Sequence, residues 1–226
     1  MSENASNGVL KERNTLIQAV NQQGRASSVI QRRGQLPSET TRRQPLFQKV
    51  MKAYLQGALH DGTFSSNRRF RISQKGTEWL EMLRNFLLCL GYHSWIYREG
   101  KTRNVYVLET LAYFLDFKLK PLALESIEEQ KSYIRGFFDA EGGIPHDCSA
   151  RFYIQLVQKD KLKIVALKEI LHELGIQCGK IHNPSKWVDP DYWRVFILAQ
   201  SQQRFIRKIG SWHPRKKPLL EQRIVI

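Results

Sequence analysis

The sequence predicts an α+β fold made of two copies of one unit, each running helix, two strands, helix, two strands, helix. Three observations predict it. An apolar helical stretch that ends on an acid and a glycine occurs twice, a Gln-Lys pair occurs twice at the end of an alternating stretch, and an amphipathic stretch closed by glycine follows each pair. The parallel order of these features indicates an internal duplication.

The first helix of each copy is predicted over residues 53–61 and 132–141. Each contains a glycine and closes on an acid-glycine pair, Asp61-Gly62 and Glu141-Gly142. Glycine after a helix is the usual stop that adopts positive φ. A carboxylate at the carboxyl end of a helix is unfavourable, because that end of the helix dipole is negative. Two such acids indicate either a bound cation or two solvated helix ends.

The strands are predicted from alternating polar and apolar residues, which give each strand one core face and one solvated face. The first strands cover residues 69–73 and 151–156. The second pair of strands in each copy is expected at 93–98 with 103–108, and at 177–182 with 193–198.

The second helix of each copy follows the Gln-Lys pair and shows apolar residues at helical spacing. Gln158-Lys159 lies 84 residues after Gln74-Lys75, and the stop glycine Gly175 lies 84 residues after Gly91. The apolar stripes are Trp79, Leu80, Leu83, Phe86, Leu87 and Leu90 in one copy, and Ile164, Leu167, Ile170, Leu171 and Leu174 in the other.

From about residue 47 to its end, the chain resembles a two-motif LAGLIDADG homing endonuclease of the monomeric type. The resemblance implies a pseudo-twofold saddle of two curved, antiparallel-rich sheets, with Gly57 and Gly136 at the interface of the motif helices. It divides the chain into an extension (1–46) and two repeats (47–124 and 125–226). The first motif departs from the family pattern, because it is one residue shorter than the second and carries His60 at a position usually small.

The resemblance implies that the protein cleaves double-stranded DNA at a long asymmetric target with Mg²⁺ or Mn²⁺. Asp61 and Glu141 would hold metal, and backbone carbonyls near the helix ends would add ligands; the candidates are His60, Gly62 and Ala140. A polar or basic pair after the strand would order the attacking water and stabilise transition-state charge. This role falls on Gln74, Lys75, Gln158 and Lys159, although lysines before a helix are also commonly only solvated.

Base contacts are expected from the solvated strand faces, because Arg can bind guanine and Gln can bind adenine with two hydrogen bonds in the major groove. The best candidates are Arg69, Arg71, Tyr153 and Gln155; outer-strand candidates are Arg98, Arg103, Lys180 and Arg194. Some of these would contact only phosphate.

The charge supports a nucleic-acid partner. The chain has 36 Lys and Arg against 21 Asp and Glu, a formal net charge of +15 and a pI near 9.9, as expected for a protein that binds phosphate backbones. A competing hypothesis is a relative that binds nucleic acid without cutting it, such as an intron RNA maturase or a DNA-binding regulator. Residues 1–46 fit a basic arm on DNA, a solvated tail or an organellar transit peptide.

The remaining signals exclude other classes. No apolar stretch predicts a membrane span, and the polar N-terminus predicts a protein that is not secreted and lies in the cytoplasm, near the nucleoid, or in an organellar matrix. Cys89, Cys148 and Cys178 show neither disulfide nor zinc spacing. The histidines form no spaced ligand set and are expected in packing or on the surface; the run Arg215-Lys216-Lys217 is expected to be a solvated tail.

Overall fold

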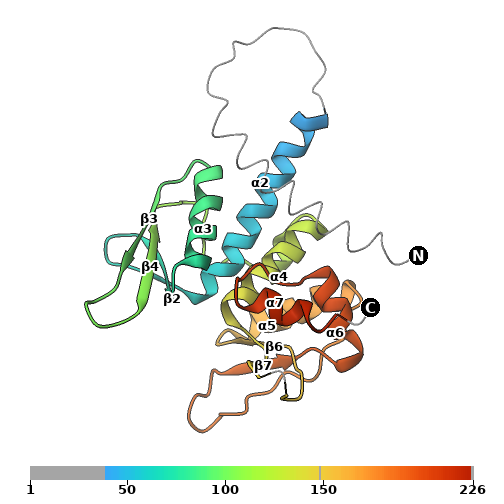
Figure 1. Cartoon of the computed structure of the whole chain (residues 1–226). Helices are drawn as coiled ribbons and strands as arrows, with labels where there is room; N and C mark the ends of the chain where they lie inside the picture. The colour runs from blue at the N-terminus through green and yellow to red at the C-terminus, as the bar shows by residue number, and fades with distance from the viewer. Residues whose placement is uncertain (1–38, 148, 225–226) are drawn as a thin grey trace. The chain divides into compact units, whose positions relative to one another are not determined.

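The computed structural model describes residues 39–147 and 149–224, and the described residues from Pro45 onward form one compact unit that contains both repeats (Figure 1). Most of the expected N-terminal extension and Cys148 therefore lie outside the described residues. The elements of the first repeat are α2 (Glu39–Ala58), the 3₁₀ turn η1 (Leu59–Asp61), β1 (Gly62–Phe64), β2 (Phe70–Lys75), α3 (Glu78–Cys89), β3 (Ser94–Arg98), β4 (Val105–Thr110) and the 3₁₀ turn η2 (Pro121–Ala123).

The second repeat follows the same order with shorter strands. Its elements are α4 (Ile127–Glu141), β5 (Gly142–Gly143), β6 (Gln155–Gln158), α5 (Lys161–Glu173), β7 (Trp193–Phe196), α6 (Ala199–Lys208) and α7 (Lys216–Glu221). Both sheets are antiparallel: sheet A has the strand order β1-β2-β4-β3, and sheet B has the order β5-β6-β7. The predicted α+β class with two antiparallel sheets is confirmed.

Two predicted elements are wrong in detail. A helix was expected to close the first repeat, but residues 111–126 contain turns and only the short η2, which begins at Pro121. The strand expected at 177–182 is reduced to two isolated bridges, Cys178 with Ile197 and His182 with Arg194. Sheet B therefore ends in an irregular edge rather than a fourth strand.

Each sheet packs its apolar face on helices of its own repeat. The first core joins α2, α3 and sheet A around Leu80, Leu83 and Leu108; the second joins α4, α5, α6 and sheet B around Leu167, Leu171 and Phe205. The apolar stripes predicted for α3 and α5 are buried as expected, apart from the half-buried Leu90. Gly91 and Gly175 follow these helices with φ of +82° and +73°, which confirms their role as stop glycines.

The two motif helices α2 and α4 cross with backbone in direct contact. A Cβ at Gly57 would lie 2.0 Å from the carbonyl oxygen of Tyr133, and a Cβ at Gly136 would lie 2.1 Å from that of Tyr54. The Ser132 hydroxyl also donates to the Val50 carbonyl across the helix pair, at 2.8 Å. Only glycine permits this separation, because any side chain would displace a rigid backbone rather than a flexible neighbour.

The glycines after the motif acids are not left-handed helix stops, contrary to the prediction. Gly62 has φ −97° and Gly142 has φ −77°, both extended, because each begins a strand. Their requirement is steric. A Cβ at Gly142 would lie 2.1 Å from the Phe138 ring, and one at Gly62 would lie 2.7 Å from the Leu59 carbonyl oxygen. Glycine here lets the chain turn directly from helix into sheet.

Candidate active site

Asp61 and Glu141 lie at the carboxyl ends of the crossing helix pair, where the short first motif is compensated by its geometry. α2 ends at Ala58 and the last three residues, including Asp61, form the 3₁₀ turn η1. A 3₁₀ turn rises about 2.0 Å per residue where an α-helix rises about 1.5 Å. Three residues of η1 thus regain about 1.5 Å, the rise of the residue that the first motif lacks.

The two carboxylates are close enough to influence each other's ionisation. Burial raises the pKa of Asp61 to about 6, opposed by a hydrogen bond from Gln74 and by the charge of Lys216. Burial and then the negative charge of Asp61 raise the pKa of Glu141 to about 7, opposed by Lys216 and Lys159. Two partly desolvated carboxylates that repel each other form a site where a cation is favourable.

These donors fit a hard divalent cation that is completed by its substrate. Among the described residues, no cluster of three or more His, Cys, Asp or Glu side chains can hold a metal. Mg²⁺ is commonly held by one or two carboxylates together with waters and substrate phosphates. The pair Asp61 and Glu141 meets that requirement. Two carboxylates are too few for a metal whose ligands are all protein side chains.

The two glutamines of the Gln-Lys pairs differ in their contacts. The Gln74 amide donates to the Asp61 carboxylate. The Gln158 amide donates instead to His60 Nδ1 at 2.8 Å, across the pseudo-twofold. Lys75 and Lys159 are exposed next to them. Gln74 therefore contacts the acid of its own motif, whereas Gln158 contacts a histidine of the other motif.

His60 fills the space that a small residue was expected to leave. Its ring packs edge-on against Phe137 at 4.8 Å between centroids, and its Nε2 lies 2.6 Å from the Tyr133 hydroxyl. Burial lowers the pKa of His60 to about 3, so the ring is neutral. Because Nδ1 accepts from Gln158, Nε2 carries the proton and donates to Tyr133. The shortened first motif thus uses its histidine to bind the second repeat.

We predict that replacing Gln74 and Gln158 by Ala has unequal effects. Gln74→Ala removes the donor that orients Asp61 and is expected to weaken the binding of Mg²⁺ or Mn²⁺ about 10–100-fold, the usual cost of losing a partner of a metal ligand. Gln158→Ala leaves His60 without its donor and should lower the free energy of unfolding by about 1 kcal/mol with a smaller effect on metal affinity. Metal titration and urea unfolding measure the two effects. Equal losses of metal affinity would contradict the different placements.

A segment near the C-terminus, Ser211–Lys216, is attached to the end of α4; we call it the C-terminal clamp. The buried Asp139 accepts from the Ser211 hydroxyl, from the backbone N–H of Trp212 at 2.9 Å and from that of His213 at 3.1 Å. Its fourth donor is the Tyr54 hydroxyl, at 2.6 Å. Asp139 therefore joins α2, α4 and the clamp at one buried carboxylate.

Lys216 closes the same helix end from the other side. Its ammonium donates to the carbonyls of Phe138, Asp139 and Gly142 at 2.7, 2.8 and 2.7 Å. It supplies the positive charge that the carboxyl end of a helix favours, and burial lowers its pKa to about 8. The prediction of a solvated tail is wrong for Lys216. Lys217 contacts Glu221 at 3.6 Å within α7.

We expect Lys216→Met to destabilise the protein, because three carbonyls lose the ammonium donor while the aliphatic stem is kept; the Phe138 carbonyl retains the Gly142 N–H as a second donor. Each buried acceptor left without a partner costs about 1–3 kcal/mol. Thermal unfolding measures the change. Lys217→Met is the matched control, since Lys217 makes a long ion pair with Glu221, whose side chain is 56% exposed; similar losses in the two variants would contradict this account of Lys216.

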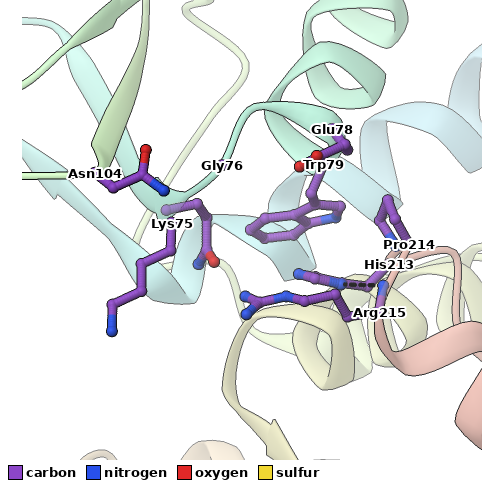
Figure 2. Close-up of a pocket in the computed structure, with 9 residues that line it drawn as sticks. Lys75, Gly76, Glu78, Trp79, Asn104, His213, Pro214 and Arg215 are labelled. Atoms are coloured by element: carbon purple, nitrogen blue, oxygen red, sulfur yellow. Dashed lines mark hydrogen bonds between the residues drawn. The ribbon is translucent and has the colours of Figure 1, made fainter.

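A cavity of about 400 Å³ opens beside Gln74, between sheet A and the clamp. Figure 2 shows Lys75 and Asn104 on one side and His213, Pro214 and Arg215 on the other. Burial lowers the pKa of His213 to about 4, so its ring is neutral where it lies 5.2 Å from the Trp79 ring. The cations of this cavity are Lys75 and Arg215, with Glu78 as the acid.

The predicted base-contacting residues lie on both sheets with different partners. On the sheet A side, Arg69, just before β2, contacts Glu109, and Arg71 contacts Glu99 and Glu109. In sheet B, the face away from the core carries Tyr153, Gln155 and Arg194, with the Phe196 ring between Tyr153 and His182. The remaining candidates are Arg98, which ends β3, and Arg103 and Lys180, which lie in loops; all three are exposed.

Sequence reasoning missed three side chains that organise this region: Asp139, Lys216 and Glu109. Asp139 had a visible signal, because a charged residue inside an otherwise apolar helical stretch requires a buried partner. Lys216 and Glu109 had none, since their partners are distant in the sequence.

The comparisons with known proteins agree with this architecture. Residues 128–210 match the family model of the LAGLIDADG-like domain. A structure of I-DmoI in complex with DNA and Mn is similar at 20% identity, with 72% of this chain and 97% of that chain covered and a TM-score of 0.55. Mesophilic variants of the homing endonuclease I-DmoI give 19% identity, 77% and 98% coverage and a TM-score of 0.59.

Full-length DUF199/WhiA from Thermatoga maritima is also similar, at 16% identity, with 84% of this chain and 64% of that chain covered and a TM-score of 0.57. No curated protein matches the sequence. The described residues thus adopt the fold seen in I-DmoI, and the match to the LAGLIDADG-like domain falls within the second repeat. None of the helices described is long and apolar enough to cross a membrane.

Proposed function

We propose that this protein is a metal-dependent endonuclease that cleaves double-stranded DNA at a long asymmetric site. The observation that carries the proposal is the pair of desolvated carboxylates, Asp61 and Glu141, at the end of a glycine-packed helix crossing. I-DmoI, which has this fold, has been crystallised with DNA and Mn and with DNA and Ca. The net charge of +15 suits a DNA partner.

The residues of the site would divide the work of phosphodiester hydrolysis. Asp61 and Glu141 would hold a divalent cation, which when bound would supply positive charge for the scissile phosphate and lower the pKa of a bound water. Gln74 holds the Asp61 carboxylate in place. Lys75 and Lys159 are exposed and directly follow Gln74 and Gln158, and each would stabilise negative charge on the phosphate. Ala140, His60 and Gly62 would offer backbone carbonyls.

The runner-up is a DNA-binding protein that does not cut, and the likeness to DUF199/WhiA keeps it in view. Loss of a motif acid would favour it, but both acids are present. The deciding experiment incubates the protein with a randomised duplex library in Mg²⁺ and then Mn²⁺. Cut fragments that share one sequence would support the nuclease, and enrichment of bound but uncut duplex would support the regulator. If neither cutting nor binding were observed, DNA would be rejected as the substrate.

We further expect a monomer, because one chain supplies both helices of the crossing. Sedimentation velocity at micromolar concentration without DNA tests this, and a stable dimer would overturn it.

A further inference from the structure

The face of sheet A that points away from the core carries a row of charged and aromatic side chains. Arg71 on β2, Glu109 on β4 and Trp95 on β3 are direct cross-strand neighbours. Their strand neighbours Ile72, Leu108 and Ile96 point to the opposite face and join the core. Directly opposite side chains on one sheet face are close enough to interact, so these three side chains form one contact group on this face.

Glu109 is the centre of that contact group. Although this carboxylate lies on the solvated face of the sheet, Glu109 is only 7% exposed, because neighbouring side chains cover it. Arg69 Nη1 donates to its Oε2 at 3.1 Å, and the Tyr97 hydroxyl donates to its Oε1 at 2.7 Å. Arg71 Nε lies 3.1 Å from Oε1, an ionic contact without hydrogen-bond geometry.

The arginines are held at other points as well. Arg71 Nη2 donates to Glu99 at 3.0 Å and to the Tyr97 hydroxyl at 3.1 Å. The Arg69 guanidinium stacks over the Trp95 ring at 4.7 Å. Two arginines and two glutamates leave this patch with no net charge, in a protein whose total is +15. Consistent with this, the hydrogen bonds from Tyr97 and Arg69 hold the pKa of Glu109 below its ordinary value despite burial.

We propose that Glu109 is a specificity-determining residue: it keeps Arg69 and Arg71 from binding phosphates of arbitrary DNA and holds them for base edges of the target. An arginine paired with a carboxylate gains little by exchanging it for a mobile phosphate contact. A base edge that offers two acceptors in fixed positions can compete, because guanine O6 and N7 match the guanidinium geometry. The inference rests on the proposed DNA partner but not on cleavage.

The test measures binding to a short random-sequence duplex without metal, as a function of salt. The slope of log affinity against log salt is negative, and each arginine that newly contacts a phosphate increases its magnitude by about 0.9. Glu109→Gln is therefore expected to increase the magnitude of that slope by about 1–2 and to strengthen non-specific binding on the order of 10-fold at low salt. Glu99→Gln, which frees only Arg71, should give a smaller increase.

The matched control is Glu125→Gln. Glu125 pairs with Lys49 at 2.7 Å, with side-chain exposures of 76% and 52%. Because this variant changes the net charge as Glu109→Gln does, an equal slope in the two variants would overturn the proposal. Arg71→Gln gives an independent check should Glu109→Gln fold poorly. Its slope on random DNA should equal that of the wild type, and a fall of about 1 in its magnitude would show that Arg71 already binds phosphate. If the wild type binds no DNA, it is the proposed function that fails.

Discussion

Glu141→Gln is expected to reduce DNA cleavage more than about 100-fold, because losing even an outer partner of a metal ligand costs about 10–100-fold. The variant keeps the shape of the side chain, and DNA affinity should survive or improve slightly as negative charge falls. Asp61→Asn should also abolish double-strand cleavage, leaving at most nicking. Plasmid cleavage in Mg²⁺ with gel-shift binding measures both. If Asp61→Asn kept full activity while Glu141→Gln was inactive, the first motif would have only a structural role.

The same substitutions should stabilise the metal-free protein at neutral pH. The pKa of Asp61 is raised from 3.8 to about 6 and that of Glu141 from 4.5 to about 7. At a pH between the ordinary pKa of each acid and its raised pKa in the folded protein, the folded protein binds more protons than the unfolded chain. The free energy of unfolding therefore decreases as pH rises through this range. We expect Tm of the wild type without metal to fall from pH 4.5 to pH 7 relative to Glu141→Gln. A constant difference between the two across this range would contradict the shared desolvation of the acids.

Gly57→Ala should cost stability and activity together. Its Cβ would lie 2.0 Å from the Tyr133 carbonyl oxygen and 2.6 Å from the Phe137 nitrogen, so α2 and α4 must separate. Overpacking costs about 1–3 kcal/mol or more, a large share of the roughly 5–15 kcal/mol that stabilises a typical domain. Because the acids depend on the helix spacing, cleavage should fall by more than the folded fraction explains.

The control for the glycine substitution is Gly179→Ala. A Cβ there meets the Phe196 carbonyl oxygen at 3.7 Å, an ordinary van der Waals contact. Chemical denaturation compares the two variants, and a Gly57→Ala protein as stable as Gly179→Ala would show that the helices tolerate a wider crossing.

Local patterns predicted the parts of this fold that depend on neighbours in sequence. The apolar stripe of α3 and the stop glycines Gly91 and Gly175 follow from helical period and backbone freedom, and the structure contains them. The glycines after the acids were found for the wrong reason. Their extended φ depends on the strands that follow and on Phe138 packed beneath Gly142, which no local rule reveals.

The sequence predicted which residue types form the candidate site but not which side chains contact one another there. The duplication put Asp61 and Glu141 in equivalent positions, but equivalence suggested that Gln158 would copy Gln74, and the histidine of the shorter motif changed its partner. Arg71 has the residue type of a base reader. Its two acidic neighbours, Glu99 on one side and Glu109 on the other, are set by strand register between distant segments and could not be predicted.

The C-terminal clamp limits how freely the halves of this protein can be exchanged. Trp212, contributed by the second repeat, lies 4.7 Å from the Tyr54 ring and 5.5 Å from the Phe86 ring, and it packs, partly buried, against the core of the first repeat. A chimaera that joins the first half of this chain to the second half of a relative would therefore need a compatible Trp212 and Asp139, or lose part of its own core. For engineering new target sites by shuffling halves, the unit to transplant is the second repeat together with the residues of the first that hold its last segment.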